Sequence, residues 1–229
     1  MEFLRGSSSP PHPDPLNLAL LTTAELAMLG ITPSLPKQDW QLAIKPLSQL
    51  TKEVNCLDDD YHQVQAVIEE NQMTASLNNQ QHNRQSDDVS DVALEVYAQG
   101  EIVAVATFSR CLEDYKNPRK STELFYELTL HSIYVKKAFR ELGLATCLCE
   151  LIINIARTDC DDLFRKLAQR SIQLKLWFSA LAITQGGEAI CDLLSESFVE
   201  MADDVIDDLI EEGVPVRYQE PMIFVDCLA

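Results

Sequence analysis

The sequence predicts an α/β or α+β fold with a mixed sheet flanked by helices. Three observations indicate this fold: helical patterns before residue 75, a pair of strand-like runs around residue 100, and alternating strand and helix patterns from residue 124 onward. The chain has 229 residues, of which 46% are apolar, so it can bury a sizeable core. We therefore expect a globular domain rather than a chain that is disordered throughout.

The N-terminal part combines a polar tail with helical patterns. Residues 1–15 are rich in Ser and Pro, which favours a disordered tail. Residues 16–30 can form a short helix, and apolar residues recur at helical spacing over 39–50 and 57–73. The polar stretch 76–91 is expected to be a loop.

The rest of the chain alternates between strand and helix patterns. Two strand-like runs flank the turn pair Gln99-Gly100, which is typical of a β-hairpin. A long β run, an amphipathic helix and another strand follow, and such a unit crosses over right-handed. In order, the expected elements are strands 92–98 and 101–108, a basic loop 109–121, strand 124–135, helix 144–157, a helical turn or two at 161–169, strand 174–183, helices 188–197 and 203–212, and strand 219–227.

Composition narrows the functional classes. The net charge of −18 would repel a phosphate backbone, which argues against nucleic acid, and would attract cationic acceptors such as amines. No apolar run approaches the roughly 20 residues of a membrane span, and no secretory signal pattern is present, so we expect a cytoplasmic protein without a membrane partner. Seven cysteines occur without a C-x-x-C pair, which favours buried thiols over a metal site.

The strongest functional signal is the loop between the long strand and the helix after it, which contains Arg140, Gly143, Ala145 and Thr146. The first N–H groups of a helix lack intrahelical partners, and the helix dipole adds partial positive charge, so such a helix start binds phosphates. Gly143 and Ala145 allow the backbone to approach a ligand, and Thr146 adds a hydroxyl. An ordinary strand-to-helix turn is the alternative explanation.

In this loop the chain resembles the GNAT family of N-acyltransferases. The family signature is a strand with two spaced apolar residues, followed by R/Q-x-x-G-x-G/A at the start of a helix. Here residues 133–135 (Ile-Tyr-Val) end the strand, and Arg140-x-x-Gly143-x-Ala145 opens an amphipathic helix.

The resemblance covers residues 38–229 and divides the chain into a tail (1–15), an N-terminal extension (16–37) and an acyltransferase domain (38–229). It implies a GNAT-type sheet, mixed but mostly antiparallel. It also implies an acetyl-CoA-dependent N-acetyltransferase in which a small-molecule or peptide amine attacks the thioester directly, with acetyl-CoA as co-substrate. A homodimer is compatible with this expectation.

The resemblance assigns the CoA thioester to the space between the long strand and strand 174–183. Backbone groups of Ile133 and Val135 would hold the pantetheine arm as an added strand, and amides of the loop would hold the pyrophosphate. Lys136 and Lys137 would meet the 3′-phosphate or form a solvated basic pair. The expected cofactor-binding set is Ile133, Tyr134, Val135, Arg140, Glu141, Leu142, Gly143, Leu144, Ala145 and Thr146.

The chain departs from the family pattern farther along. Members often carry A-x-x-x-Y-x-x-x-G-F, whereas this chain has Ala189-x-x-x-Leu193-x-x-x-Ser197-Phe198. The tyrosine that often protonates the leaving thiolate is therefore Leu193, and the usual asparagine before the helix is also absent. These departures favour the alternative of a non-catalytic GNAT-fold CoA-binding or interaction module.

Acyl transfer to an amine needs a general base, and the long strand carries candidates. Glu127, Thr129 and His131 alternate onto one face of that strand. A glutamate on this strand is a frequent base in relatives, so Glu127 is the first catalytic candidate. His131 is the second, because the ordinary pKa of histidine lies near neutrality. A β-bulge would shift these facings, and an exposed strand end or a satisfied core histidine are the structural alternatives.

An acidic segment lies between residues 198 and 222. In the family this segment helps to wall the acceptor site, which here would favour a cationic acceptor. The alternative is the solvated face of an amphipathic helix. The acidic residues are Asp203, Asp204, Asp207, Asp208, Glu211 and Glu212, and the apolar residues expected inward are Val205, Ile206, Leu209 and Ile210.

Overall fold

The computed structural model describes residues 40–50, 91–113, 122–168, 170, 172–182 and 184–227. The expected tail, the N-terminal extension and the helix expected at 57–73 lie outside these residues. Among the described helices, none is long and apolar enough to cross a membrane.

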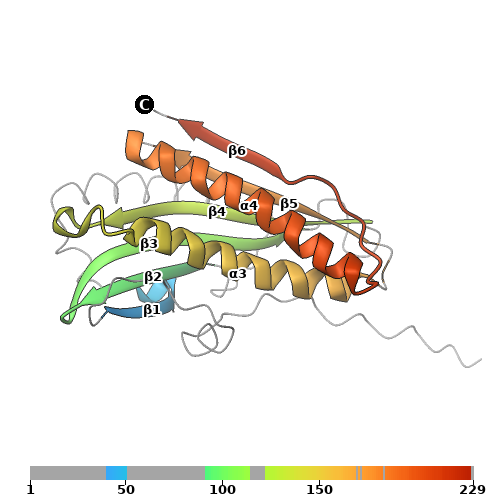
Figure 1. The fold of residues 1–229 in the computed structure, drawn as a ribbon, viewed down its shortest axis with the longest axis horizontal. Helices are drawn as coiled ribbons and strands as arrows, with labels where there is room; N and C mark the ends of the chain where they lie inside the picture. The colour runs from blue at the N-terminus through green and yellow to red at the C-terminus, as the bar shows by residue number, and fades with distance from the viewer. Residues whose placement is uncertain are drawn as a thin grey trace, which may run out of the picture.

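A six-stranded mixed sheet forms the centre of the fold, with the strands in the order β1-β2-β3-β4-β5-β6 (Figure 1). β1 to β4 are antiparallel neighbours, and β5 and β6 run parallel to β4. This arrangement confirms the predicted fold class. The bounds are β1 Trp40–Pro46, β2 Asp91–Ala98, β3 Glu101–Glu113, β4 Glu123–Val135, β5 Gln173–Ala182 and β6 Met222–Cys227.

Two long helices lie side by side across one face of the sheet (Figure 1). They are α3 (Leu144–Leu167) and α4 (Gln185–Glu211), and we call the sheet face that they cover the helical face. Their apolar stripes and the strand residues beneath them form the main core. Each helix is longer than expected. The helical segments expected at 144–157 and 161–169 join into α3, and those expected at 188–197 and 203–212 join into α4.

The β1 strand corrects the helix expected at residues 39–50. Trp40, Leu42 and Ile44 all pack against the main core, which is the period of two that a strand presents to one face. The same residues also fit helical spacing in part, and pairing with β2 decides between the two. Pro46 is tolerated because β1 is an edge strand.

The helical face contains one buried charged network. Arg110 Nη1 donates to both carboxylate oxygens of Asp159 at 2.8 Å, and the Tyr126 hydroxyl donates to Asp159 Oδ2 at 2.9 Å. All three side chains are buried. Burial raises the pKa of the Asp159 carboxyl, and Arg110 opposes that rise. The network joins β3, β4 and α3 and leaves the carboxylate fully partnered.

Candidate functional site

The candidate site begins where β4 loses its neighbour. The β4–β5 ladder ends at the pair Leu130–Ala180, whereas β4 continues to Val135. Residues His131 to Val135 therefore have β3 on one side and no paired strand on the other among the described residues. We call these residues the open segment of β4. It lies where the resemblance placed the CoA thioester.

A β-bulge marks the start of the open segment. Thr107 pairs with Ser132 and Phe108 pairs with Leu130, so His131 is the extra residue. Before the bulge, Leu130 belongs to the core of the helical face; after it, Ile133 packs against that core and Tyr134 turns to the other face. Before the bulge the even-numbered residues of β4 face the helices, and after it the odd-numbered residues do.

Backbone groups of the open segment point toward the missing neighbour. The Lys136 N–H donates to Val103 O of β3, and successive residues of a strand point their amides to opposite sides. The amides of Ile133 and Val135 therefore point away from β3. The carbonyl of Val135 points the same way and accepts a hydrogen bond from Arg140 Nε at 3.0 Å, and the Arg140 guanidinium lies 5.9 Å from the Tyr134 ring centroid.

The loop ends at the start of α3, which no side chain caps. A single 3-10 turn (Lys137–Phe139) is followed by two left-handed residues, Glu141 with φ 65° and Gly143 with φ 77°. A side chain on Gly143 would meet open space, so the positive φ is what favours glycine there. Gly143 is the N-cap residue of α3 and provides no side-chain cap.

The first turn of α3 leaves its N–H donors available to an anion. It contains no acidic residue, and no side chain caps it. Ala145 is half-buried and Thr146 is exposed, so the turn is accessible. Leu142 is exposed, whereas the Leu144 side chain is buried in the core, so only the backbone of Leu144 is available to a ligand.

Lys136, beside the loop, forms an ion pair with Glu101. Its Nζ lies 3.5 Å from Glu101 Oε2 across the end of the β2–β3 hairpin. Glu101 is itself largely exposed, so this ion pair holds Lys136 only weakly. Lys137 is exposed on the 3-10 turn.

Glu127 lies on the sheet face opposite the helices, half-buried, with two hydroxyl donors. Glu127 Oε1 accepts hydrogen bonds from Ser179 Oγ at 3.2 Å and from Thr129 Oγ1 at 3.3 Å, and these two hydroxyl oxygens are 2.8 Å apart. The hydroxyl groups orient the carboxylate between β4 and β5. Ser179 was not singled out from the sequence, although its alternation with Trp177 in the expected strand was a usable signal.

His131 lies on the same face but is a weaker candidate base. Its Nε2 is 2.9 Å from Ser109 Oγ, and Ser109 pairs in register with Thr129. Burial lowers the pKa of His131 to about 4, so the imidazole is neutral at neutral pH. A base works best when its pKa lies near the working pH, and the lowered pKa of His131 makes the imidazole a weak base at neutral pH.

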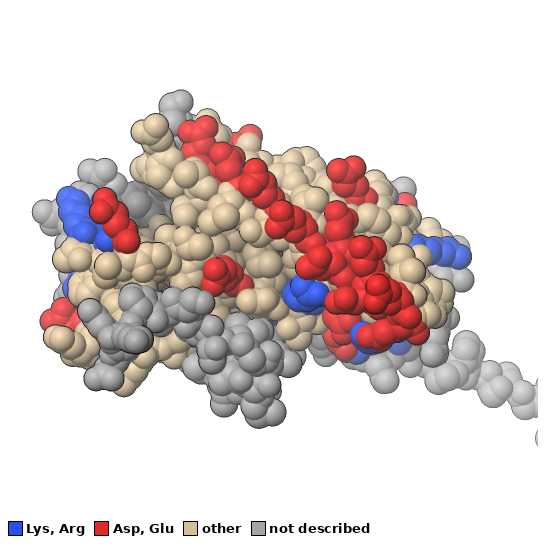
Figure 2. All heavy atoms as spheres, in the orientation of Figure 1, with Lys and Arg blue, Asp and Glu red and all other residues tan. Residues whose placement is uncertain are grey.

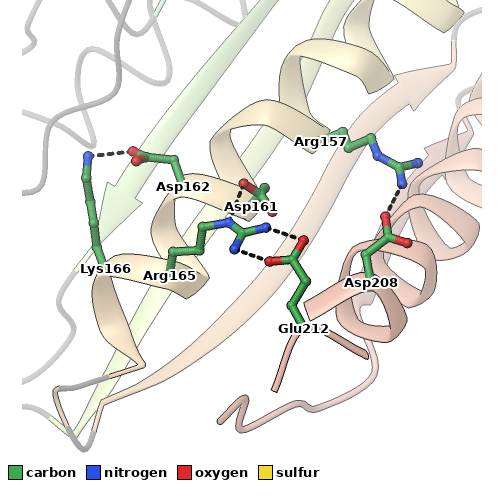
Figure 3. A network of polar contacts seen from close by, with 7 residues as sticks. All are labelled: Arg157, Asp161, Asp162, Arg165, Lys166, Asp208 and Glu212. Carbon is green, nitrogen blue, oxygen red and sulfur yellow. Dashed lines mark hydrogen bonds and ion pairs between the residues drawn. The ribbon is translucent and has the colours of Figure 1, made fainter. Parts of the chain in front are cut away.

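The acidic segment lies away from this face. Asp203 to Glu211 belong to α4, which covers the helical face, and they form much of the acidic stripe in Figure 2. Several are paired with α3. Arg157 contacts Asp204, and Figure 3 shows Arg157 with Asp208 and Arg165 with Glu212. The amphipathic-helix alternative therefore describes the segment, which lies on the opposite side of the sheet from Glu127, and its expected role as an acceptor wall stays a prediction. Ile210 also differs from expectation, since it is 59% exposed.

Leu193, which has no hydroxyl group, lies on α4. The Leu193 side chain is half-buried on α4 and packs against the main core. The described cysteines on the helices behave as expected of buried thiols: burial raises the pKa of Cys147 to about 11 and that of Cys149 to about 12. Thiols of this kind are poor nucleophiles at neutral pH.

The chain is similar to several solved structures. No family model matches it, and no curated protein matches it. A predicted acetyltransferase with acetyl-CoA from Clostridium acetobutylicum is 13% identical, covers 67% of this chain and 86% of its own, and has a TM-score of 0.35. A ribosomal-protein-alanine N-acetyltransferase from Brucella melitensis is 18% identical, with 67% and 89% covered and a TM-score of 0.31.

A third similar structure is an aminoglycoside 6′-N-acetyltransferase from Acinetobacter baumannii, 19% identical, with 67% and 89% covered and a TM-score of 0.31. All three are acetyltransferases, the class of protein that the sequence resemblance names.

Proposed function

We propose that residues 38–229 form a GNAT-type N-acetyltransferase domain that transfers an acetyl group from acetyl-CoA to a primary amine. One observation carries the proposal: the open segment of β4 leads directly into a helix start whose N–H donors the chain itself leaves uncapped. An extended arm ending in a pyrophosphate matches both features, because it can add to a strand edge and place its phosphates at the helix start.

In this proposal the acceptor lies on the face that carries Glu127. Glu127 takes the proton of the ammonium, directly or through a water, and the free amine attacks the thioester carbonyl. A C–N bond forms, the attacking nitrogen loses its second proton to solvent, and the C–S bond breaks. CoA leaves as the thiolate, which takes a proton from solvent because Leu193 cannot supply one. Backbone N–H groups near the bulge at His131 would polarise the carbonyl.

Cofactor binding is tested by titrating acetyl-CoA into the full chain by calorimetry. Gly143→Val adds a Cβ and backbone strain at φ 77° and is expected to weaken binding about tenfold or more. The matched control is Gly100→Val, at φ 84° in the β2–β3 turn, which carries the same kind of strain away from the loop. Equal affinities for the two variants would contradict the site, and no binding by the unaltered chain would contradict the proposal.

Catalysis is tested by thiol release with a panel of amines. Glu127→Gln keeps the size and hydrogen-bonding of the side chain but removes its basicity, and general-base catalysis contributes roughly 100- to 10,000-fold. We expect kcat/KM for the amine to fall by about that factor while the affinity for acetyl-CoA is unchanged. An unchanged rate would remove Glu127 from the mechanism.

A second candidate function is a non-catalytic CoA-binding module. It is favoured by one observation, the core-packed Leu193 at the position of the usual proton donor. It predicts binding of acetyl-CoA without thiol release for any amine in the panel, so the two experiments together distinguish the candidates.

A further inference from the structure

Three aromatic side chains stand in a row beside Glu127. Phe125, Trp177 and Phe224 come from β4, β5 and β6, and we call them the aromatic wall. The ring centroids of Phe125 and Trp177 are 4.8 Å apart and those of Trp177 and Phe224 are 5.6 Å apart, both in edge-to-face arrangements. Phe224 is 52% exposed, so one end of the wall is open to a ligand.

One end of the aromatic wall already holds an ammonium group of the chain. Lys175 Nζ lies 5.5 Å from the Phe125 ring centroid and 3.0 Å from Glu123 Oε1. The ammonium is thus shared between an aromatic ring and a carboxylate, the two groups that attract it most strongly.

Glu127 and Trp177 likewise place a carboxylate beside an aromatic ring on the same face, but without an ammonium group. It pairs in register with Trp177, and it accepts a hydrogen bond from Ser179, whose neighbour on β6 is Phe224. No lysine or arginine of the described chain contacts Glu127. A cation stabilises a half-buried carboxylate that lies beside aromatic rings, here the half-buried Trp177 and the exposed Phe224.

We propose that Glu127, Trp177 and Phe224 bind the head of the acceptor, a primary ammonium attached to an apolar chain or ring. The carboxylate receives the ammonium, and the adjacent carbons lie against Trp177 and Phe224. Polyhydroxylated amines fit less well, because their hydroxyl groups would be desolvated against ring faces that offer no hydrogen bonds apart from the single indole N–H of Trp177. This inference rests on the proposed function for its meaning, but amine binding is measured separately from transfer.

The direct test is an NMR titration of the full chain that follows the indole N–H signals of its two tryptophans. The ligands are benzylamine, its neutral counterpart benzyl alcohol, and kanamycin as a polyhydroxylated amine. We expect benzylamine to shift the Trp177 signal and leave the Trp40 signal, and to bind about tenfold or more tightly than benzyl alcohol. Similar affinities for the amine and the alcohol, or tighter binding of kanamycin, would overturn the proposal.

The matched variants lie next to each other on β6. Phe224→Leu keeps an apolar side chain and removes the ring, and it is expected to weaken benzylamine about three- to tenfold, whereas Phe224→Tyr keeps the affinity. Ile223→Leu is the control, because Ile223 pairs with Phe178, a core residue of the helical face, and so lies on the other side of the sheet. Equal effects of Phe224→Leu and Ile223→Leu would refute the aromatic wall as a binding surface.

The two proposals can fail independently. Acetyl-CoA binding and transfer to other amines without benzylamine binding would refute the aromatic wall and keep the transferase. Benzylamine binding at Trp177 without any transfer would keep the aromatic wall and refute the transferase.

Discussion

The two long helices begin in opposite ways. At the start of α4, Thr184 Oγ1 accepts a hydrogen bond from the Gly187 N–H at 3.0 Å, and Glu188 places a carboxylate in the first turn. At the start of α3, Gly143 offers no cap and the first turn has no acidic residue. The chain thus caps the start of α4 with its own side chains and leaves the start of α3 uncapped, as the proposed cofactor site requires.

Two carboxylates, Glu127 on β4 and Asp159 on α3, differ in the same way. Asp159 is paired with Arg110 and Tyr126 inside the helical face, whereas Glu127 on the opposite face has only hydroxyl donors among the described residues. A charge that is neutralised within the chain contributes to stability, and a charge that awaits a partner is available for function. Four experiments test this difference between groups that the chain pairs itself and groups that it leaves for a ligand.

Removing the partner of Asp159 should give the largest effect. Arg110→Met leaves a buried carboxylate without its cation, and we expect a loss of about 3–5 kcal/mol in the free energy of unfolding. The double variant Arg110→Met with Asp159→Leu should recover most of that loss, because both charges are then absent. Urea unfolding measures both, and an equally unstable double variant would show that the network matters for packing rather than charge.

Adding an acid to the uncapped helix start should separate binding from stability. Ala145→Glu gives α3 the first-turn carboxylate that α4 has, so the free energy of unfolding is expected to stay level or rise by about 0.3–1 kcal/mol. The same charge repels phosphates, and the affinity for acetyl-CoA should fall about tenfold to a hundredfold. Retained affinity would mean that the start of α3 binds no anion.

His131 should make stability depend on pH. Its pKa in the folded chain is lowered to about 4 from 6.5, so between these values the unfolded chain binds more protons and stability falls as the pH falls. The loss is complete near pH 4 and, allowing for partial exposure, amounts to about 1–3 kcal/mol. His131→Gln should flatten the pH dependence in urea unfolding between pH 6.5 and 4, and an identical slope in the variant would assign it to other groups.

Removing the cap of α4 should give the smallest effect. Thr184→Ala loses the hydrogen bond to Gly187 N and is expected to cost about 1 kcal/mol in the free energy of unfolding. The affinity for acetyl-CoA should not change, because α4 starts outside the proposed cofactor site. A change in affinity larger than twofold would contradict the division of roles between the two helix starts.

Local patterns predicted the parts of the fold in which sequence and tertiary structure agree. The strand alternation in residues 124–135 led to β4 almost at its observed bounds, and the apolar stripe after Leu144 led to the observed start of α3. The helix predicted at residues 39–50 was wrong, because Trp40 and Ile44 satisfy both helical and strand spacing. Only pairing with β2, some fifty residues away, decides between the two.

The sequence by itself determined the loop at Arg140–Thr146 and the presence of Glu127 and His131 on one strand, because glycine placement and alternation are local properties. Tertiary structure decided three other things: the end of the β4–β5 ladder at Leu130, the bulge that turns Tyr134 to the other face, and the position of Trp177 and Phe224 beside Glu127. These depend on strand register and on which strands become neighbours, and both are set by pairing between distant segments.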